Sequence, residues 1–146
     1  VDGIVLPAIA MTSDKDQCSF LNEAGRCSIH MFRPGFCRLF PLGRVYDGTG
    51  FSYFLQTGQC KKEHLAKVKV RQWINIPELK RYEQFVCDWH YFLKDLAKTS
   101  QGLSPELIKT LHSYILKVFY LTPYQDGSDF YDQFYMRLND AKKLFL

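Results

Sequence analysis

The sequence predicts an α+β protein, in which a small cysteine-rich half of hairpins and loops packs against a C-terminal half of three helices. Short strand patterns separated by turn residues occupy residues 1–75, whereas apolar residues recur at three- and four-residue steps through residues 76–146. The 146 residues are 47% hydrophobic and 16% aromatic. This composition suits one packed domain built from the two halves.

Two hairpins and an edge strand are expected in the first half. Residues 22–26 contain Asn and Gly and suit a turn, which would bring Cys18 and Cys27 near each other. Residues 47–50 suit the turn of a second hairpin. The alternation of basic and apolar residues over 67–71 is typical of an edge strand.

Three helices are expected in the second half. Pro77 suits the first turn of one helix, Ser104 with Pro105 marks the start of the next, and residues 128–129 open the third. The apolar faces follow from the helical period. The second helix is expected to bury Leu107, Leu111, Tyr114, Ile115, Val118 and Leu121, and the third Phe130, Phe134, Leu138, Ala141 and Phe145.

The composition and the motifs exclude several classes of function. No apolar run approaches the roughly 20 residues of a membrane helix, and a net charge of +4 does not by itself favour nucleic-acid binding. The sequence contains no phosphate-binding glycine motif and no serine-hydrolase or zinc-protease motif. Nothing in it indicates secretion, so a reducing cytoplasm is the expected compartment.

Four of the five cysteines are clustered in the first half, and they are Cys18, Cys27, Cys37 and Cys60. Thiolates bind zinc and iron–sulfur clusters, and four of them complete a tetrahedral site or hold a cubane. The spacing C-x8-C-x9-C-x22-C contains no C-x-x-C pair. The spacing alone therefore leaves metal binding, buried inert thiols and disulfides open. The fifth, Cys87, lies in the first amphipathic helix, where a small buried side chain is the better interpretation.

Two arginines and a histidine lie near Cys37 in the sequence. Arg33 and Arg38 are candidates for tuning or shielding a cluster, because a guanidinium stabilises nearby thiolates. The alternative interpretation is a salt bridge or a carbonyl contact that fixes the turn at Pro34. His30 is interpreted as a packing residue at the end of a strand rather than as a ligand.

The segment from Cys18 to Pro41 resembles a bacterial cysteine-cluster family of zinc- or iron-chelating proteins, which includes flagellin lysine N-methylases. That family reads C-x-F-L, a short turn, G-R-C-S-I-Y and then R-P-x-x-C-R-x-[YF]-P. The first three cysteines and Pro41 fall in step with this pattern, and so do Gly25-Arg26, Arg33-Pro34 and Arg38. The resemblance covers residues 5–75, and the helical remainder carries no motif of the family.

The resemblance implies that Cys18, Cys27, Cys37 and Cys60 bind zinc or an iron–sulfur centre, with a [4Fe–4S] cluster preferred. The family has Tyr where this sequence has His30, so no ligand role is transferred to that residue. Members also carry an upstream cysteine cluster, and this sequence begins downstream of its place. The cluster is therefore expected to be missing here, or the chain is part of a longer protein.

Three functions stay open at this point. The first is a metal-binding protein whose iron–sulfur cluster transfers electrons or senses redox state. The second is an enzyme of the lysine N-methylase type, which would act on a protein substrate. The third is a structural zinc site in a domain that binds a protein partner. The sequence does not decide whether the protein is an enzyme, and it points to no membrane partner.

Overall fold

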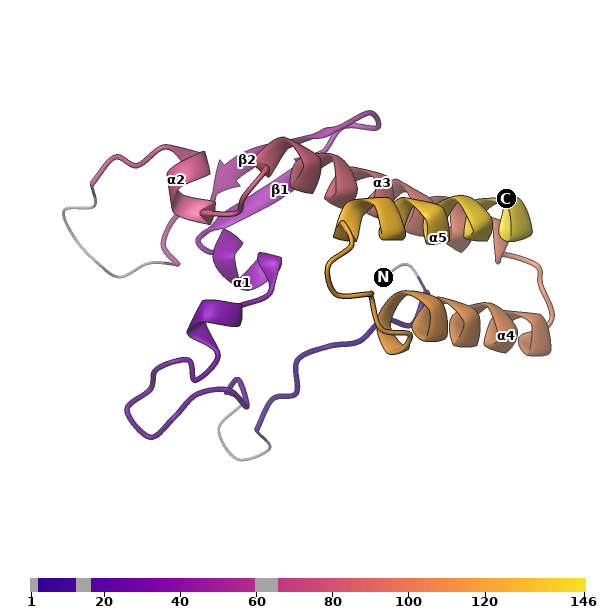
Figure 1. Cartoon of the computed structure of the whole chain (residues 1–146), viewed down its shortest axis with the longest axis horizontal. Helices are drawn as coiled ribbons and strands as arrows, with labels where there is room; N and C mark the ends of the chain where they lie inside the picture. The colour runs from indigo at the N-terminus through magenta and orange to yellow at the C-terminus, as the bar shows by residue number, and fades with distance from the viewer. Residues whose placement is uncertain (1–2, 13–16, 60–65) are drawn as a thin grey trace. The chain divides into compact units, whose positions relative to one another are not determined.

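The computed structural model describes residues 3–12, 17–59 and 66–146 (Figure 1). Its two-stranded antiparallel sheet and its helices confirm the α+β class. The chain forms two compact units, one of which is Ile9–Tyr82, while the other joins Val1–Ala8 to Glu83–Leu146. The expected organisation as one domain of two halves stays a prediction.

The sheet of the first unit is the second expected hairpin. Strands β1 (Leu42–Tyr46) and β2 (Phe51–Leu55) pair antiparallel, with Leu42 opposite Leu55 and Tyr46 opposite Phe51. Asp47 builds the turn, because its Oδ1 accepts hydrogen bonds from the backbone N–H groups of Thr49 (3.0 Å) and Gly50 (2.7 Å). These hydrogen bonds, which favour the ionised carboxylate, lower the pKa of Asp47.

The first expected hairpin is present as a hydrogen-bonded turn with isolated β-bridges rather than as two strands. Asn22 closes the turn, since its backbone N–H donates to the Arg26 carbonyl (2.9 Å) and its Oδ1 accepts from the N–H groups of Ala24 and Arg26. Leu21 forms an antiparallel bridge with Cys27. The turn prediction over residues 22–26 is therefore confirmed.

Three short helices complete the description of this unit, namely the 3₁₀ helix η1 (His30–Phe32), α1 (Gly35–Leu39) and α2 (Val70–Ile74). The edge strand expected over residues 67–71 is wrong, because Val70 begins α2. Packing overrides the alternating pattern: Ile74 is completely buried, and the Trp73 indole donates to the Phe40 carbonyl (3.0 Å).

The second unit contains α3 (Leu79–Thr99) from Glu83 onward, α4 (Pro105–Leu116), the π-helix η2 (Lys117–Leu121) and α5 (Phe130–Phe145). Ser104 and Asp129 cap α4 and α5 as expected, by accepting hydrogen bonds from the backbone N–H groups of Leu107 (3.4 Å) and Asp132 (2.9 Å). The first helix begins at Leu79, two residues after Pro77. In the described part of the chain, no helix is long and apolar enough to span a bilayer.

The core of this unit follows the expected faces with three exceptions. Its buried residues include Ile4, Phe92, Leu96, Leu111, Ile115, Phe119, Phe134, Leu138 and Ala141. Leu107, Leu121 and Phe130, which were expected on buried faces, are 55%, 74% and 40% exposed. Leu107 lies in the first turn of α4, and the wider π turn brings Phe119 rather than Leu121 to the core.

Arg137 of α5 ties this helix to the chain around the end of η2. Its Nη1 donates to the carbonyls of Val118 (2.6 Å) and Thr122 (2.8 Å), and its Nη2 donates to that of Pro123 (2.7 Å). The guanidinium carbon also lies 3.9 Å from the centroid of the Tyr124 ring. One cation therefore satisfies three carbonyls that follow or end a helix.

Replacing Arg137 by Met is expected to lower the free energy of unfolding by about 2 to 3 kcal/mol, because three carbonyls lose a charged donor. Urea unfolding followed by circular dichroism measures this loss. Lys142→Met, which removes a cation from an exposed position of the same helix, should change stability by less than about 0.5 kcal/mol. Equal losses in the two variants would contradict the role of the carbonyl contacts.

Candidate metal centre

Cys18 and Cys27 are brought together by the first turn. The backbone N–H of Leu21 donates to the Cys18 carbonyl (3.0 Å), and Leu21 forms its bridge with Cys27. Cys18 forms a second bridge with Met11 on its other side. Both thiols are free and half-buried. One residue thus joins the two cysteine-bearing segments, as the hairpin prediction required.

Cys37 lies in α1, directly after the break at Arg33 and Pro34. The break is fixed by Pro34, whose carbonyl accepts hydrogen bonds from the backbone N–H groups of Cys37 (3.0 Å) and Arg38 (3.2 Å). The Cys37 thiol is also free and half-buried. The third thiol therefore lies on a short helix in a segment that begins at Pro34 and ends at Pro41.

The pKa of the Cys37 thiol responds to the two other described thiols of the predicted ligand set. Burial raises the pKa of the Cys37 thiol, the charges of Cys18 and Cys27 raise this pKa further, and the Arg33 guanidinium opposes them. Because Coulomb interactions weaken with distance, these effects place the three sulfurs and one cation in the same neighbourhood. Adjacent thiolates repel one another, so a metal cation that neutralises them suits this environment.

Arg33 supplies an unused hydrogen-bond donor to this neighbourhood. Its Nε is buried and has no hydrogen-bond acceptor among the residues that the structure describes. A buried guanidinium nitrogen without a partner is costly, and it suits an anionic acceptor such as a thiolate or an inorganic sulfide. The residues present therefore fit a sulfur-ligated metal group.

Arg38 uses its guanidinium on the backbone instead. Nε donates to the Arg33 carbonyl (3.2 Å), Nη2 to that of Met31 (3.0 Å) and Nη1 to that of Asn75 (3.3 Å). Three donors thus connect η1 and the Cys37 loop to the end of α2. The carbonyl contact that was the alternative interpretation describes this side chain well.

Asn75 was not identified from the sequence, although its carbonyl is part of this arrangement. It caps α2 in the left-handed conformation, with φ 48°. Asn tolerates this conformation better than most residues, which is the signal the sequence offered. Its partner Arg38 is distant in the sequence, so the contact itself had no local signature.

The fourth predicted ligand, Cys60, lies outside the described residues. Within residues 3–12, 17–59 and 66–146, no three His, Cys, Asp or Glu side chains are grouped closely enough to hold a metal ion. The four-thiolate set therefore stays a prediction, and the structure shows only that Cys18 and Cys27 influence the pKa of Cys37.

The two remaining candidates lie elsewhere. His30 is exposed and begins the 3₁₀ helix η1 rather than ending a strand. Cys87 is buried in α3, with 8% of its surface exposed. Its interpretation as a small core residue is confirmed.

Half-buried thiols on turns and a short helix, with a partly buried arginine in the same segment, are features of cysteine-rich metal-binding domains. Residues 6–61 match the family model of the CxxCxxCC domain, described as "Putative zinc- or iron-chelating domain". This match confirms the resemblance drawn from the motifs, and the matched segment contains all four predicted ligands. No curated protein and no solved structure matches the chain.

Proposed function

We propose that Cys18, Cys27, Cys37 and Cys60 hold a [4Fe–4S] cluster, and that the protein transfers electrons or senses redox state through it. The observation that carries the proposal is the half-buried Cys37 thiol, whose pKa responds to Cys18, Cys27 and Arg33, together with the unpartnered Nε of Arg33. When bound, such a cluster supplies one-electron chemistry. A reducing compartment such as the cytoplasm would keep the thiols available for it.

Arg33 and Arg38 take different roles in this proposal. Arg33 would donate from Nε to a sulfur of the bound group, and such hydrogen bonds shift the reduction potential of iron–sulfur centres. Arg38 would act as a positioning residue, because it holds the carbonyls of Met31 and Arg33 and thereby the loop that presents Cys37. A change at Arg33 should move the potential, whereas a change at Arg38 should mainly weaken retention of the metal.

The small core of the first unit supports a stabilising contribution from the metal. Among the described residues of Ile9–Tyr82, the buried hydrophobic side chains are Ile74 and Tyr82. A unit with so little buried apolar surface needs another source of stability, and the free energy of metal binding adds to that of folding. We therefore infer that the bound metal also maintains the fold around the thiols.

Protein purified without oxygen tests the identity of the metal. Elemental analysis, sulfide determination and a visible spectrum should show iron, inorganic sulfide and a broad absorption that bleaches on reduction. A colourless protein with stoichiometric zinc would reject the iron–sulfur proposal and leave the thiolate ligands in place. Protein that binds neither metal under these conditions would reject both.

The pH dependence of metal uptake follows from the pKa of Cys37. Because burial and the neighbouring thiols raise this pKa, the metal-free protein carries a protonated Cys37 at neutral pH, and uptake must release the proton. We expect the apparent affinity for Zn²⁺, used as the probe, to increase with pH between about pH 6 and pH 8. Each thiol that loses its proton contributes up to about tenfold per pH unit.

Competition with a chelator at several pH values measures this dependence, and calorimetry in two buffers of different ionisation enthalpy counts the protons. An affinity that is independent of pH would contradict ligation by protonated thiols.

A further inference from the structure

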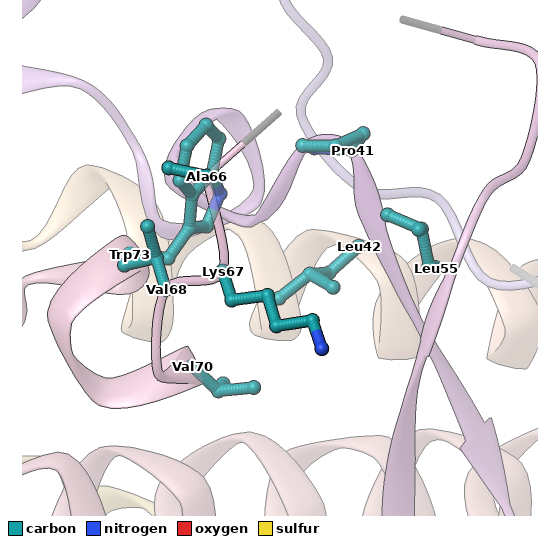
Figure 2. A pocket seen from close by; sticks show the side chains of 8 residues that line it. All are labelled: Pro41, Leu42, Leu55, Ala66, Lys67, Val68, Val70 and Trp73. Atoms are coloured by element: carbon teal, nitrogen blue, oxygen red, sulfur yellow. The ribbon is translucent and has the colours of Figure 1, made fainter. Parts of the chain in front are cut away.

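A cleft of about 430 Å³ lies in the first unit between the open end of the hairpin and the segment that leads into α2 (Figure 2). Its lining is mostly aliphatic, with one indole. It is lined by Pro41, Leu42, Leu55, Ala66, Lys67, Val68, Val70 and Trp73. The volume falls within the range of small-molecule sites in proteins, which is roughly 300–1,000 Å³.

The hairpin wall of the cleft is held by the backbone. Leu42 and Leu55 are a directly opposed pair of the β-ladder, so they lie side by side. Gln56 fixes this end of the hairpin, because its backbone N–H donates to the Pro41 carbonyl (2.9 Å) and its Nε2 to that of Leu42 (3.0 Å). The wall is therefore formed before any ligand binds.

The opposite wall is equally defined. Val70 and Trp73 lie three residues apart in α2 and share one side of that helix. The hydrogen bond from the Trp73 indole to the Phe40 carbonyl (3.0 Å) fixes the orientation of the ring. Even so, Trp73 and Leu55 are 47% and 55% exposed. Apolar side chains held open to solvent in a concave site are typical of a binding surface.

The charge at the cleft has one sign. Lys67 is the only charged residue among the described residues that line it, and its side chain extends toward Leu42 and Leu55 in Figure 2. Lys69 and Arg71 follow in the same segment. Residues 41–46, 51–56 and 66–75, which contain the lining, include no Asp or Glu. An apolar ligand that carries one anionic group complements this arrangement.

We propose that the cleft binds a small aliphatic carboxylate, with its chain between the Leu42–Leu55 pair and Trp73 and its carboxylate on Nζ of Lys67. Burial of the chain supplies most of the affinity, and the ammonium selects the anionic end. The proposal stands apart from the metal centre, because it needs no thiol and no particular metal.

Decanoate is the probe, added to the metal-loaded full-length chain and followed by calorimetry and by Trp73 fluorescence in a Trp89→Phe background. Saturable binding of one decanoate is expected, with decanol bound about tenfold more weakly. Lys67→Met should weaken decanoate binding by about fivefold to tenfold and remove the preference over decanol. Lys69→Met, which removes the same charge beside the cleft, should change it less than about twofold.

A second matched pair tests the apolar wall. Val68 lines the cleft and is 49% exposed, whereas Val45 is 57% exposed and does not line it. Val68→Asp should abolish decanoate binding, and Val45→Asp should leave it unchanged. The proposal is overturned if decanol binds as tightly as decanoate, if the two Asp variants behave alike, or if phosphatidylglycerol vesicles bind the protein while free decanoate does not.

Discussion

Replacement of Cys37 by Ser is expected to abolish stable metal binding and to loosen the unit Ile9–Tyr82. Cys37 is the thiol whose pKa responds to both Cys18 and Cys27, so its loss should remove a ligand that the proposed site needs. A serine hydroxyl stays protonated at neutral pH and is a poor ligand for zinc or iron. Loss of a direct ligand should cost at least the ~100-fold in affinity that a supporting residue can cost.

Metal analysis after desalting and hydrogen exchange of residues 17–59 measure the two effects. We expect metal content below about one tenth of that of the unchanged protein, because weakly held metal is lost on desalting. We also expect faster exchange at the Asn22 turn and in α1, since the unit has few buried apolar residues to replace the contribution of the metal.

Cys87→Ala is the matched control for the loss of a thiol. Cys87 is buried in α3, so its replacement should retain the metal while lowering stability slightly through the smaller side chain. Metal retained by Cys37→Ser, or metal lost from Cys87→Ala, would contradict the predicted ligand set.

The parts of the fold that were predicted correctly carry strong local signals. Ser104 and Asp129 cap their helices through their own side chains, and Asn22 and Asp47 build their turns in the same way. In each case the residue type and the hydrogen bond lie within a few positions of each other. Such signals need no knowledge of the tertiary structure.

The strand predicted over residues 67–71 was wrong because distant contacts set the environment of this segment. The alternation of residues 67–71 predicted a strand, yet Ile74 is buried and Trp73 bonds to Phe40 across the unit, and both belong to a helix. Ile4 lies near the start of the chain and is buried in the core of the helical unit. A short apolar pattern does not specify such partners.

The candidate site was predictable in its residue types but not in its arrangement. Clustered cysteines and the Arg-Pro-x-x-Cys-Arg motif identified the segment through its resemblance to a cysteine-cluster family, which the family-model match over residues 6–61 confirms. The different contacts of Arg33 and Arg38 depend on where the backbone carbonyls lie. Arg38 reaches Asn75, and Arg33 retains a buried Nε, only once the turns and α2 are in place.

Replacement of Leu138 by Ala is expected to lower the free energy of unfolding of the helical unit by about 2 to 5 kcal/mol, because it removes a large side chain from a closely packed core. Leu138 is 1% exposed and belongs to the cluster that includes Ile115, Phe119 and Phe134. Urea unfolding followed by circular dichroism gives the loss. If the Ala variant does not fold, Leu138→Met, which nearly conserves the volume, should cost less than about 1.5 kcal/mol.

Leu144 lies on the same helix and is 61% exposed, so Leu144→Ala makes the same chemical change without a cavity and should alter stability by less than about 0.5 kcal/mol. Similar losses from Leu138→Ala and Leu144→Ala would contradict the assignment of Leu138 to the core, since only burial distinguishes the two positions.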